Sequence, residues 1–280
     1  MVTPKTRRWV SLATRYLILT VLAIVLVYPF LFMIATSFKT RTASLGNPFE
    51  LLPTEPTLEN YARALGEENF GLYFFNSVLV ATASTFFIVL LSSMMAYGFT
   101  RFRFPGRRLL FALIIAGLTI PTMMLIIPQF ILAKDLRLLD SLPGLVPFYV
   151  GTALGFNTFL LCGFFETIPR ELDEAMLMDG AGAWRRYFHL ALPLSKPALA
   201  TVVIFSFLGS WDEFVWALTV INDPNQRTLP VAIALFHGQH STSWGLVFAA
   251  SVIAIIPVLI VYITFQRFFV AGITTGAVKS

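Results

Sequence analysis

The amino-acid sequence predicts an all-α membrane protein with six transmembrane helices, and three observations support this prediction. Hydrophobic residues make up 57% of the 280 residues and charged residues only 12%, about half the share of charge in an ordinary soluble domain. Six apolar runs are each about as long as the ~20 residues that a helix needs to cross the hydrocarbon layer. Lys and Arg are concentrated in alternate segments between these runs, as in proteins that cross a membrane several times.

The chain begins with a basic arm over residues 1–15, and the first apolar run follows over 16–38. This run is longer than the ~7–15 apolar residues of a secretory signal peptide, and no small-x-small cleavage site follows it. We therefore expect an uncleaved first transmembrane helix. A polar loop rich in turn residues comes next, over 39–71.

The other spans lie within a core over 72–265. We place them at about 72–99, 109–133, 144–165, 198–221 and 245–265. Pro121 and Pro128 predict a kink in the third span, because a proline removes a helical hydrogen bond. Gly151 and Gly155 have the small-xxx-small spacing of close helix packing in the fourth. The segment 222–244 between the last two spans is expected to be a polar loop.

The positions of Lys and Arg predict the topology. With the N-terminus in the cytoplasm, the inner segments hold 14 of the 20 Lys and Arg residues. They lie in the N-terminal arm, in the turn at 101–108, in the loop at 166–197 and in the tail at 266–280. The positive-inside rule therefore predicts N-in and C-in, and it places the 166–197 loop in the cytoplasm.

The 166–197 loop is the only long polar interruption in the second half of the chain, and it predicts two short helices. Pro169 suits the first helical position, where no N–H partner is needed. Three acidic residues fall in or near the first turn, where the helix dipole favours negative charge: Glu171, Asp173 and Glu174. Gly180 or Gly182 supplies a stop that tolerates positive φ.

The second helix of this loop runs over roughly 183–190, and Pro193 and Pro197 are expected to close it off. Both helices are amphipathic. The first places Leu172, Ala175 and Met176 on one face, and the second pairs Trp184 with Phe188. Periodicity alone leaves two interpretations open, a helix lying among lipid headgroups and a helix docked in the groove of another protein.

The spacing of this loop resembles the EAA loop of permease subunits in ATP-binding-cassette (ABC) importers. The family pattern is Glu-Ala-Ala, a glycine four positions after the last alanine, then nine residues and Ile-x-Leu-Pro. Met176 replaces the second alanine and Leu190 the isoleucine, and both changes keep an apolar side chain. The resemblance rests on Glu174, Ala175, Met176, Gly180, Leu190, Leu192 and Pro193.

Other stretches resemble the carbohydrate-type, or maltose-type, branch of these permeases, so that the likeness covers nearly the whole chain. They are Pro56-Thr57-Leu58-Glu59-Asn60-Tyr61, Asn76-Ser77, Ala96-Tyr97-Gly98-Phe99 with Arg103-Phe104-Pro105-Gly106, Gly209 to Phe214, and Val270 to Lys279. The Gly209 to Phe214 stretch resembles the branch's Trp-Asn-Asp-Phe, from which Asp212 and Glu213 depart in detail.

The resemblance implies a type I ABC importer permease fold in the cell (inner) membrane, surrounded by lipid and importing a mono-, di- or oligosaccharide. It implies a heterodimer with a second permease subunit, two ATP-binding-cassette ATPase subunits and an extracytoplasmic substrate-binding protein. The principal sugar site in such pairs is expected mainly in the other permease subunit. The tail residues Thr274, Thr275 and Gly276 would approach the ATPase dimer. The ATPase contact is expected at Glu174, Ala175, Met176, Asp179, Gly180, Trp184, Leu190, Leu192 and Pro193.

Nothing in the sequence predicts catalysis in this chain. No lysine follows a glycine, so a phosphate-binding Gly-Lys-Ser/Thr loop is missing, and ATP and Mg²⁺ are expected on partner subunits. A Gly-x-Ser-x-Gly elbow is also lacking. The single Cys162 cannot form an internal disulfide or a zinc cluster. His237 and His240, three residues apart, lack further ligands, so no metal site is predicted. The net charge of +5 reflects where Lys and Arg lie relative to the membrane, so no nucleic-acid partner is predicted.

An acidic pair, Asp212 and Glu213, lies in the fifth span between Trp211 and Phe214. Charged groups at membrane depth are costly and generally face a cavity or a partner. One hypothesis is that these four residues line or gate the translocation path. The other is a structural bond or headgroup exposure for the carboxylates, and helix or lipid packing for the aromatic rings.

Two alternatives to a sugar importer remain at this stage. A permease of the same architecture could carry glycerol phosphate, a polyamine or a peptide. A stand-alone secondary transporter with six spans would belong to another class. Inverted-topology repeats would support the latter, and the sequence shows none.

Overall fold

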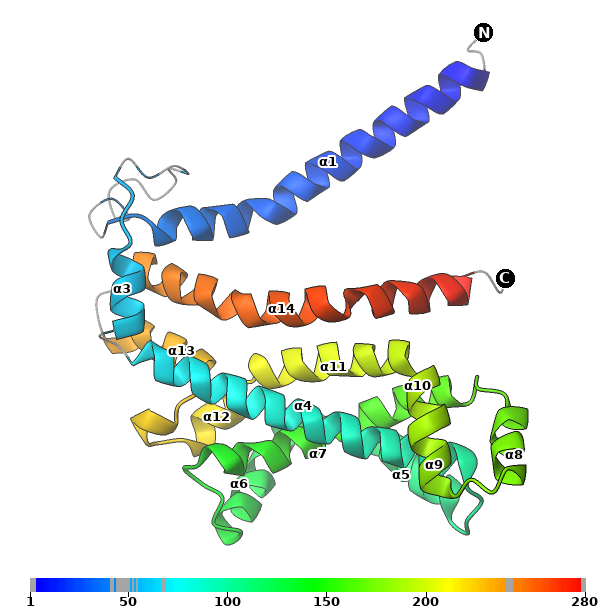
Figure 1. Ribbon diagram of the computed structural model, residues 1–280. Helices are drawn as coiled ribbons and strands as arrows, with labels where there is room; N and C mark the ends of the chain where they lie inside the picture. Colours follow the sequence, from blue (N-terminus) through cyan, green and yellow to red (C-terminus); the bar gives the residue numbers. More distant parts are fainter. Residues whose placement is uncertain are drawn as a thin grey trace. The chain divides into compact units, whose positions relative to one another are not determined.

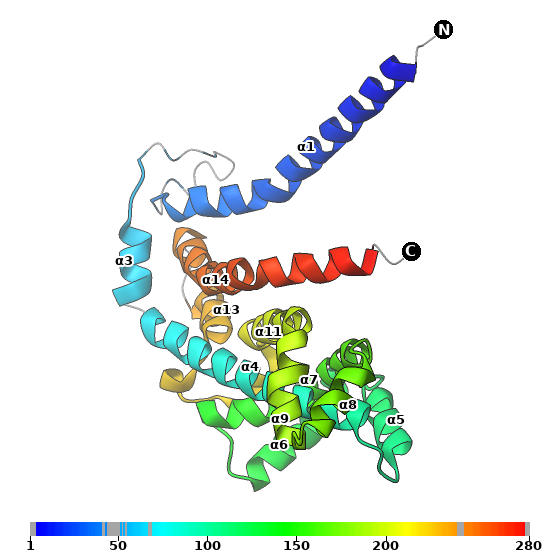
Figure 2. The ribbon, with the colours of Figure 1, turned by 45° about the vertical axis from the view of Figure 1, so that its right-hand side comes forward.

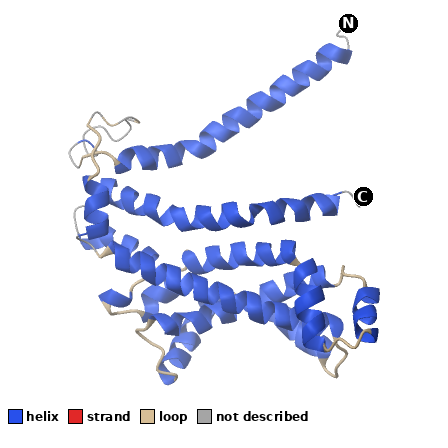
Figure 3. Ribbon diagram, viewed as in Figure 1, coloured by secondary structure: helices blue, strands red, loops and turns tan. Residues whose placement is uncertain are grey.

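The computed structural model describes residues 4–40, 43, 51, 53, 55–66, 69–239 and 244–277, with side chains described within 12–235 and 244–267. Every regular element in this part of the chain is a helix (Figure 3), which confirms the predicted all-α class. Two units make up the chain, and each is described by itself. The first comprises Met1–Gly71 and Ile233–Ala254, and the second comprises Leu72–Ala232 and Ile255–Ser280.

In the part of the chain that the structure describes, five helical segments are long and apolar enough to cross a bilayer. They are Leu12–Ser37 within α1 (Pro4–Ser37), Phe70–Arg101 (α4), Leu142–Phe165 (α7), Lys196–Val220 (α11 with α12) and Trp244–Arg267 within α14 (Trp244–Ala277). A sixth crossing results if Arg107–Gly117 (α5) and Thr122–Asp135 (η1, Thr122–Leu125, with α6, Ile126–Asp135) form one span. These two are bent by 96°.

The bend in the third span is the kink that its prolines predicted. Pro121 has an extended backbone, with ψ 128°, and directly precedes η1. The third span is therefore interrupted between the end of α5 at Gly117 and the start of η1 at Thr122, rather than merely bent. Pro128 falls in the first turn of α6, where a missing N–H costs little.

The first unit contains α1, the short helix α3 (Glu59–Gly66) and the start of α14. Asn60 ties α1 to α3, because its Nδ2 donates to the carbonyls of Ser37 at 2.9 Å and Lys39 at 2.8 Å. A Cβ on Gly245, in the first turn of α14, would lie 2.6 Å from the same Asn60 Nδ2. Only a glycine lets α14 approach this amide so closely.

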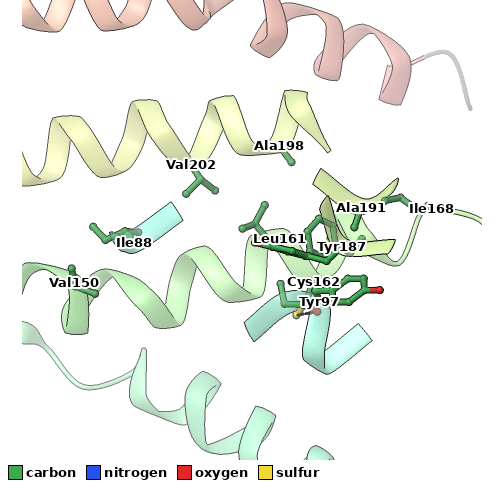
Figure 4. Close-up of a cluster of buried hydrophobic side chains, with 12 residues drawn as sticks. Ile88, Tyr97, Val150, Leu161, Cys162, Ile168, Tyr187, Ala191, Ala198 and Val202 are labelled. Carbon is green, nitrogen blue, oxygen red and sulfur yellow. Dashed lines mark hydrogen bonds between the residues drawn. The ribbon is translucent and has the colours of Figure 1, made fainter. Parts of the chain in front are cut away.

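The core of the second unit lies between α4, α7 and α11, which run side by side in Figures 1 and 2. Figure 4 shows the buried side chains that meet there, among them Ile88, Leu161 and Val202 from the three helices. Tyr187 and Ala191 enter the same cluster from the 166–197 loop. The loop is therefore packed into the core of the helices that it connects.

The segment between the fifth and sixth spans is not the polar loop that the sequence predicted. Leu229–Gln239 form a helix, α13, after the short turn η3 (Pro224–Gln226). Two side chains of α4 form hydrogen bonds with the start of this segment. Asn76 Nδ2 donates to the carbonyls of Asn225 and Arg227, each at 2.9 Å, and Ser77 Oγ accepts from the Leu229 amide at 2.8 Å. The prediction was wrong because the segment was judged by its polar flanking residues, although it contains a short apolar run that forms α13.

The sixth helix also continues beyond the expected end at residue 265. The backbone of α14 is helical to Ala277, so most of the expected tail extends the span. Thr274, Thr275 and Gly276 lie in this extension, and their side chains are outside the described residues.

Gly151 and Gly155 of α7 differ in how closely other side chains approach them. A Cβ on Gly155 would lie 2.9 Å from Leu118 Cδ2 and 3.6 Å from Ile114 Cγ2, whereas a Cβ on Gly151 would meet nothing within 4 Å. Overpacking of this kind costs about 1–3 kcal/mol. We expect Gly155→Val to lower the thermal unfolding midpoint in detergent, and the matched control Gly151→Val to leave it near that of the wild type. Equal midpoints for the two variants would contradict the close approach.

Candidate functional site

The first helix of the 166–197 loop, α8, spans Arg170–Met178. It begins one residue later than the sequence predicted, with Pro169 as the N-cap in an extended conformation. Its C-terminus is closed at Gly180, which has φ 77°. The Gly180 amide donates to the Leu177 carbonyl at 3.0 Å and the Ala181 amide to that of Met176 at 2.9 Å. This pair of bonds is a Schellman motif, so Gly180 is the positive-φ stop.

The second part of the loop is longer than the predicted helix over 183–190. Helix α9 (Ala183–Arg186) continues into a π-helical turn, η2 (Tyr187–Ala191), and then into α10 (Leu192–Leu194). The expectation that Pro193 ends this helix is wrong. In the wider π turn the Leu192 amide bonds to the Tyr187 carbonyl, five residues back. The backbone hydrogen bonds therefore no longer follow the α-helical pattern when the chain reaches Pro193, which has no amide to donate. Pro197 lies in the first turn of α11 (Lys196–Trp211).

Several large apolar side chains of the loop are exposed in the chain. Met178 is 87% exposed, Trp184 62% and Phe188 51%. The rings of Trp184 and Phe188 stack with centroids 6.1 Å apart, which confirms their predicted pairing on one face. Leu172 and Leu177 are also exposed on α8. Exposed apolar surface of this kind typically marks a contact with a protein or a membrane.

The opposite side of the loop is anchored by Tyr187, which is only 2% exposed. Its hydroxyl shares a hydrogen bond of 2.7 Å with Ser93 Oγ of α4. Its ring lies 5.3 Å from that of Tyr97, centroid to centroid, in the cluster of Figure 4. Burial raises the pKa of the Tyr187 phenol.

A second anchor is a buried group of three charges. Asp173 of α8 lies between two arginines, with Oδ2 2.9 Å from Arg101 Nε and Oδ1 3.5 Å from Arg186 Nη1. The side chains of Arg101, Asp173 and Arg186 are only 6%, 10% and 16% exposed, respectively. Arg101 Nη2 also donates to the carbonyls of Phe165 and Ile168, each at 2.9 Å. Arg101 therefore joins the ends of α4 and α7 to α8.

The residues that the resemblance assigned to an ATPase contact are distributed over both sides of the loop. Glu174, Ala175, Asp179, Gly180, Trp184 and Pro193 are exposed, while Met176, Leu190 and Leu192 are half-buried. Glu174 borders a pocket of about 140 Å³ that also contains Arg101 and Asp173. From the sequence, Asp173 was predicted only to be an acidic residue in the first turn of a helix. The roles of Arg101 and Tyr187 in fixing the loop were not predicted. Their partners lie on other helices, and no local pattern reveals such pairs.

The acidic pair of the fifth span lies at a break in the helix. Helix α11 ends at Trp211, and α12 (Val215–Val220) begins after three intervening residues. Glu213 caps α12, because its Oε1 accepts from the Trp216 amide at 2.7 Å and its Oε2 from the Ala217 amide at 3.1 Å. Tyr149 of α7 donates its hydroxyl to the same Oε2 at 2.7 Å. Both carboxylate oxygens are thus bonded within the chain.

The other three residues expected along the translocation path are differently placed. Trp211 is 3% exposed, and its ring stacks on Phe207 with centroids 5.7 Å apart. It is therefore a packing residue of α11. Asp212 is exposed, and Phe214 is half-buried at the break. Of these four, Glu213 borders a pocket that Asn157 and Ser206 also line.

No group of three or more His, Cys, Asp or Glu side chains that could hold a metal ion occurs among the residues whose side chains are described. The side chains of His237 and His240 lie outside that part of the chain. Cys162 is a buried free thiol in the core of the second unit.

These features define a polytopic helical membrane protein whose fourth and fifth spans are joined by a rigidly anchored helical loop with an exposed apolar face. A family model described as "Binding-protein-dependent transport system inner membrane component" matches residues 88–275. The protein is 38% identical over 275 residues to the diacetylchitobiose uptake system permease protein of Streptomyces coelicolor, covering 98% of this chain and 90% of that protein. The chain belongs to the family of binding-protein-dependent transport system inner membrane components.

Further comparisons agree with this assignment. The chain is 37% identical over 262 residues to the trehalose/maltose transport system permease protein of Thermococcus litoralis, covering 92% of this chain and 93% of that protein. A crystal structure of a bacterial ABC transporter involved in the import of the acidic polysaccharide alginate contains a chain of the same fold. The TM-score is 0.82 at 24% identity, over 96% of this chain and 99% of that chain. The predicted type I permease fold and multi-pass inner-membrane location are confirmed.

The buried charges lead to a test of the loop's anchoring. Removing one partner of a buried ion pair costs about 3–5 kcal/mol, because the other charge stays buried. We expect Asp173→Asn to lower the unfolding midpoint and to make the 166–197 loop more sensitive to protease. The control Asp179→Asn changes an exposed carboxylate and should have little effect. Unchanged stability and protease resistance in Asp173→Asn would contradict the anchoring role.

Proposed function

We propose that this protein is a permease subunit of an ABC importer and forms half of the translocation pathway for a sugar. The observation that supports this best is the 166–197 loop, whose outer face is apolar and exposed and whose inner face is bonded to α4 and α7. A loop built in this way suits the transmission of force from a docked partner to the transmembrane helices. Relatives named for diacetylchitobiose and for trehalose and maltose support a mono-, di- or oligosaccharide as the substrate.

In this proposal the chain has no catalytic activity of its own. Two ATP-binding-cassette ATPase subunits bind ATP and Mg²⁺, a second permease subunit completes the pathway, and an extracytoplasmic binding protein delivers the sugar. Helix α8 docks in a cleft of one ATPase, with Glu174 and Gly180 among the contacts. The tail residues Thr274, Thr275 and Gly276 approach the ATPase dimer. Surrounding lipid covers the apolar spans.

Coupling then follows from two discrete packings of the helices. ATP binding closes the ATPase dimer and moves α8, and the permease changes from an inward-facing to an outward-facing state. Two bonded connections support this proposal. Asp173 links α8 to Arg101 at the ends of α4 and α7, and Tyr187 links η2, which continues α9, to Ser93 in α4. A displacement of α8 or α9 would therefore move α4 and α7.

Gly180 offers a test of this coupling. Its φ of 77° is inaccessible to proline, whose φ is about −65°, so Gly180→Pro must change how α8 ends. We expect the complex reconstituted in proteoliposomes to hydrolyse ATP but to lose at least about tenfold of its ATP-dependent sugar uptake, ~1.4 kcal/mol of coupling.

The matched control is Gly182→Pro. Gly182 already has φ −65°, so a proline there fits the backbone, and uptake should remain near that of the wild type. Normal uptake by Gly180→Pro would contradict the coupling role. Loss of uptake in the wild-type complex, or uptake without an ATPase partner, would contradict the proposed function itself.

The proposed docking requires the loop to face the cytoplasm. Met178 is 87% exposed, so Met178→Cys should leave the fold unchanged and react readily with a maleimide. In oriented vesicles a membrane-impermeant maleimide should label this cysteine only from the cytoplasmic side. Adding the ATPase subunits should slow the labelling. Reaction from the outer side would contradict the predicted N-in and C-in topology.

A further inference from the structure

An open pocket of about 240 Å³ lies between α7 and α11 in the second unit. Thr152, Phe156 and Asn157 of α7 line one side, and Ser206 and Gly209 of α11 line the other. Glu213 borders it at the end of α11. A Cβ on Gly209 would meet nothing within 4 Å, so part of this space exists because residue 209 has no side chain.

Two buried polar atoms in this pocket have no hydrogen-bond partner within the described part of the chain: Asn157 Oδ1 and Ser206 Oγ. Both residues are only 4% exposed. The Asn157 amide is held in place, since its Nδ2 donates to the Ala153 carbonyl at 2.9 Å. A buried polar group without a partner costs about 1–3 kcal/mol. Because both residues line the same pocket, a ligand bound there can supply the missing partner to each.

The two groups lie near the middle of the predicted membrane layer. Asn157 precedes the end of α7 at Phe165 by about two turns, or ~12 Å at ~1.5 Å per residue. Ser206 follows the start of α11 at Lys196 by nearly three turns, or ~15 Å. Both distances are measured from the ends that the 166–197 loop joins, and half of a ~30 Å hydrocarbon layer is ~15 Å. A solute crossing the membrane must pass this depth.

The side chains that line the pocket indicate which class of ligand it can bind. Asn157 Oδ1 and the Glu213 carboxylate only accept hydrogen bonds, and the Ser206 hydroxyl can accept or donate. The side chains of Phe156 and Phe205 are 49% and 50% exposed and offer apolar surface beside these groups. No Lys, Arg or His is among the described lining residues. A carboxylate or phosphate ligand would lack a cation there and would lie near Glu213.

We propose that this pocket is a subsite of the translocation path, within this chain, that binds the hydroxyl groups of an uncharged sugar. The inference rests on the proposed function and deepens it. The family resemblance places the principal sugar site mainly in the other permease subunit, whereas the α7–α11 pocket gives this subunit its own contact. Asn157 accepts a sugar hydroxyl, Ser206 bonds to a second, and the phenylalanine rings cover the apolar face of the sugar.

The test uses the complete transporter, with both permease subunits, the ATPase and the binding protein, in proteoliposomes. The neutral probes are diacetylchitobiose, trehalose, maltose and a galactooligosaccharide, and the acidic probe is an alginate oligosaccharide. Asn157→Leu keeps the branched shape and the number of side-chain heavy atoms but removes the amide, and Ser206→Ala removes the hydroxyl. We expect each to raise the KM for the transported neutral sugar about five- to tenfold, since one hydrogen bond is lost. Basal ATP hydrolysis and co-purification of the subunits should be unchanged.

Filling the pocket provides a second measurement. Gly209→Leu should abolish uptake without destabilising the chain, because the new side chain enters open space. The matched control is Gly163→Leu, on α7 outside the pocket, where a Cβ also meets nothing within 4 Å. This control should transport normally.

The outcomes separate the subsite from its rivals and from the proposed function. Loss of the second permease subunit from Asn157→Leu preparations, with an unchanged KM in the complexes that remain, would show that a partner side chain fills the pocket. Unchanged uptake in all three pocket variants, or preferred uptake of the alginate oligosaccharide by the wild type, would also overturn the subsite and leave the importer intact. A wild-type complex that transports none of the five probes would overturn both.

Discussion

The structure of the loop between α7 and α11 depends on the carboxylate of Asp173. It is buried between Arg101 and Arg186, at 2.9 and 3.5 Å, and each of these charges would be costly to bury alone. Arg101 completes the arrangement by donating to two carbonyls at the end of α7, where a cation also interacts favourably with the helix dipole. One group of charges thus fixes α8 against the ends of two transmembrane helices.

The loop has two faces with different physical roles. On the inner face, Tyr187 and Ala191 pack into the core cluster of α4, α7 and α11 (Figure 4). A hydrogen bond to Ser93 fixes the tyrosine. On the outer face, Met178, Trp184 and Phe188 are exposed. A flexible loop with the same apolar residues would bury them against its own helices. The rigid inner face prevents that collapse and keeps the outer surface available to a partner.

The fifth span shows a comparable division within the membrane. Glu213 lies where a charge is costly, yet both of its oxygens are bonded, to the first amides of α12 and to Tyr149. The capping of α12 explains the helix break between Trp211 and Val215 without a second subunit. Trp211 packs on Phe207. In the part of the chain that the structure describes, two neutral side chains with an unpartnered polar atom, Asn157 and Ser206, line the pocket that Glu213 borders.

The sequence by itself determined what depends on local composition and spacing. The apolar runs predicted the spans, Gly180 the positive-φ end of α8, and Trp184 with Phe188 an apolar face, because each of these follows from residues a few positions apart. Only the tertiary structure decided which groups are paired. Arg101 and Asp173 are separated by many residues, as are Ser93 and Tyr187, so that no local pattern links them. The tertiary structure also shows the helix α13 where a polar loop was expected, and a π turn before Pro193 where the proline was expected to end the helix. Whether a buried polar atom such as Asn157 Oδ1 is satisfied depends on packing between helices, which a one-dimensional pattern does not contain.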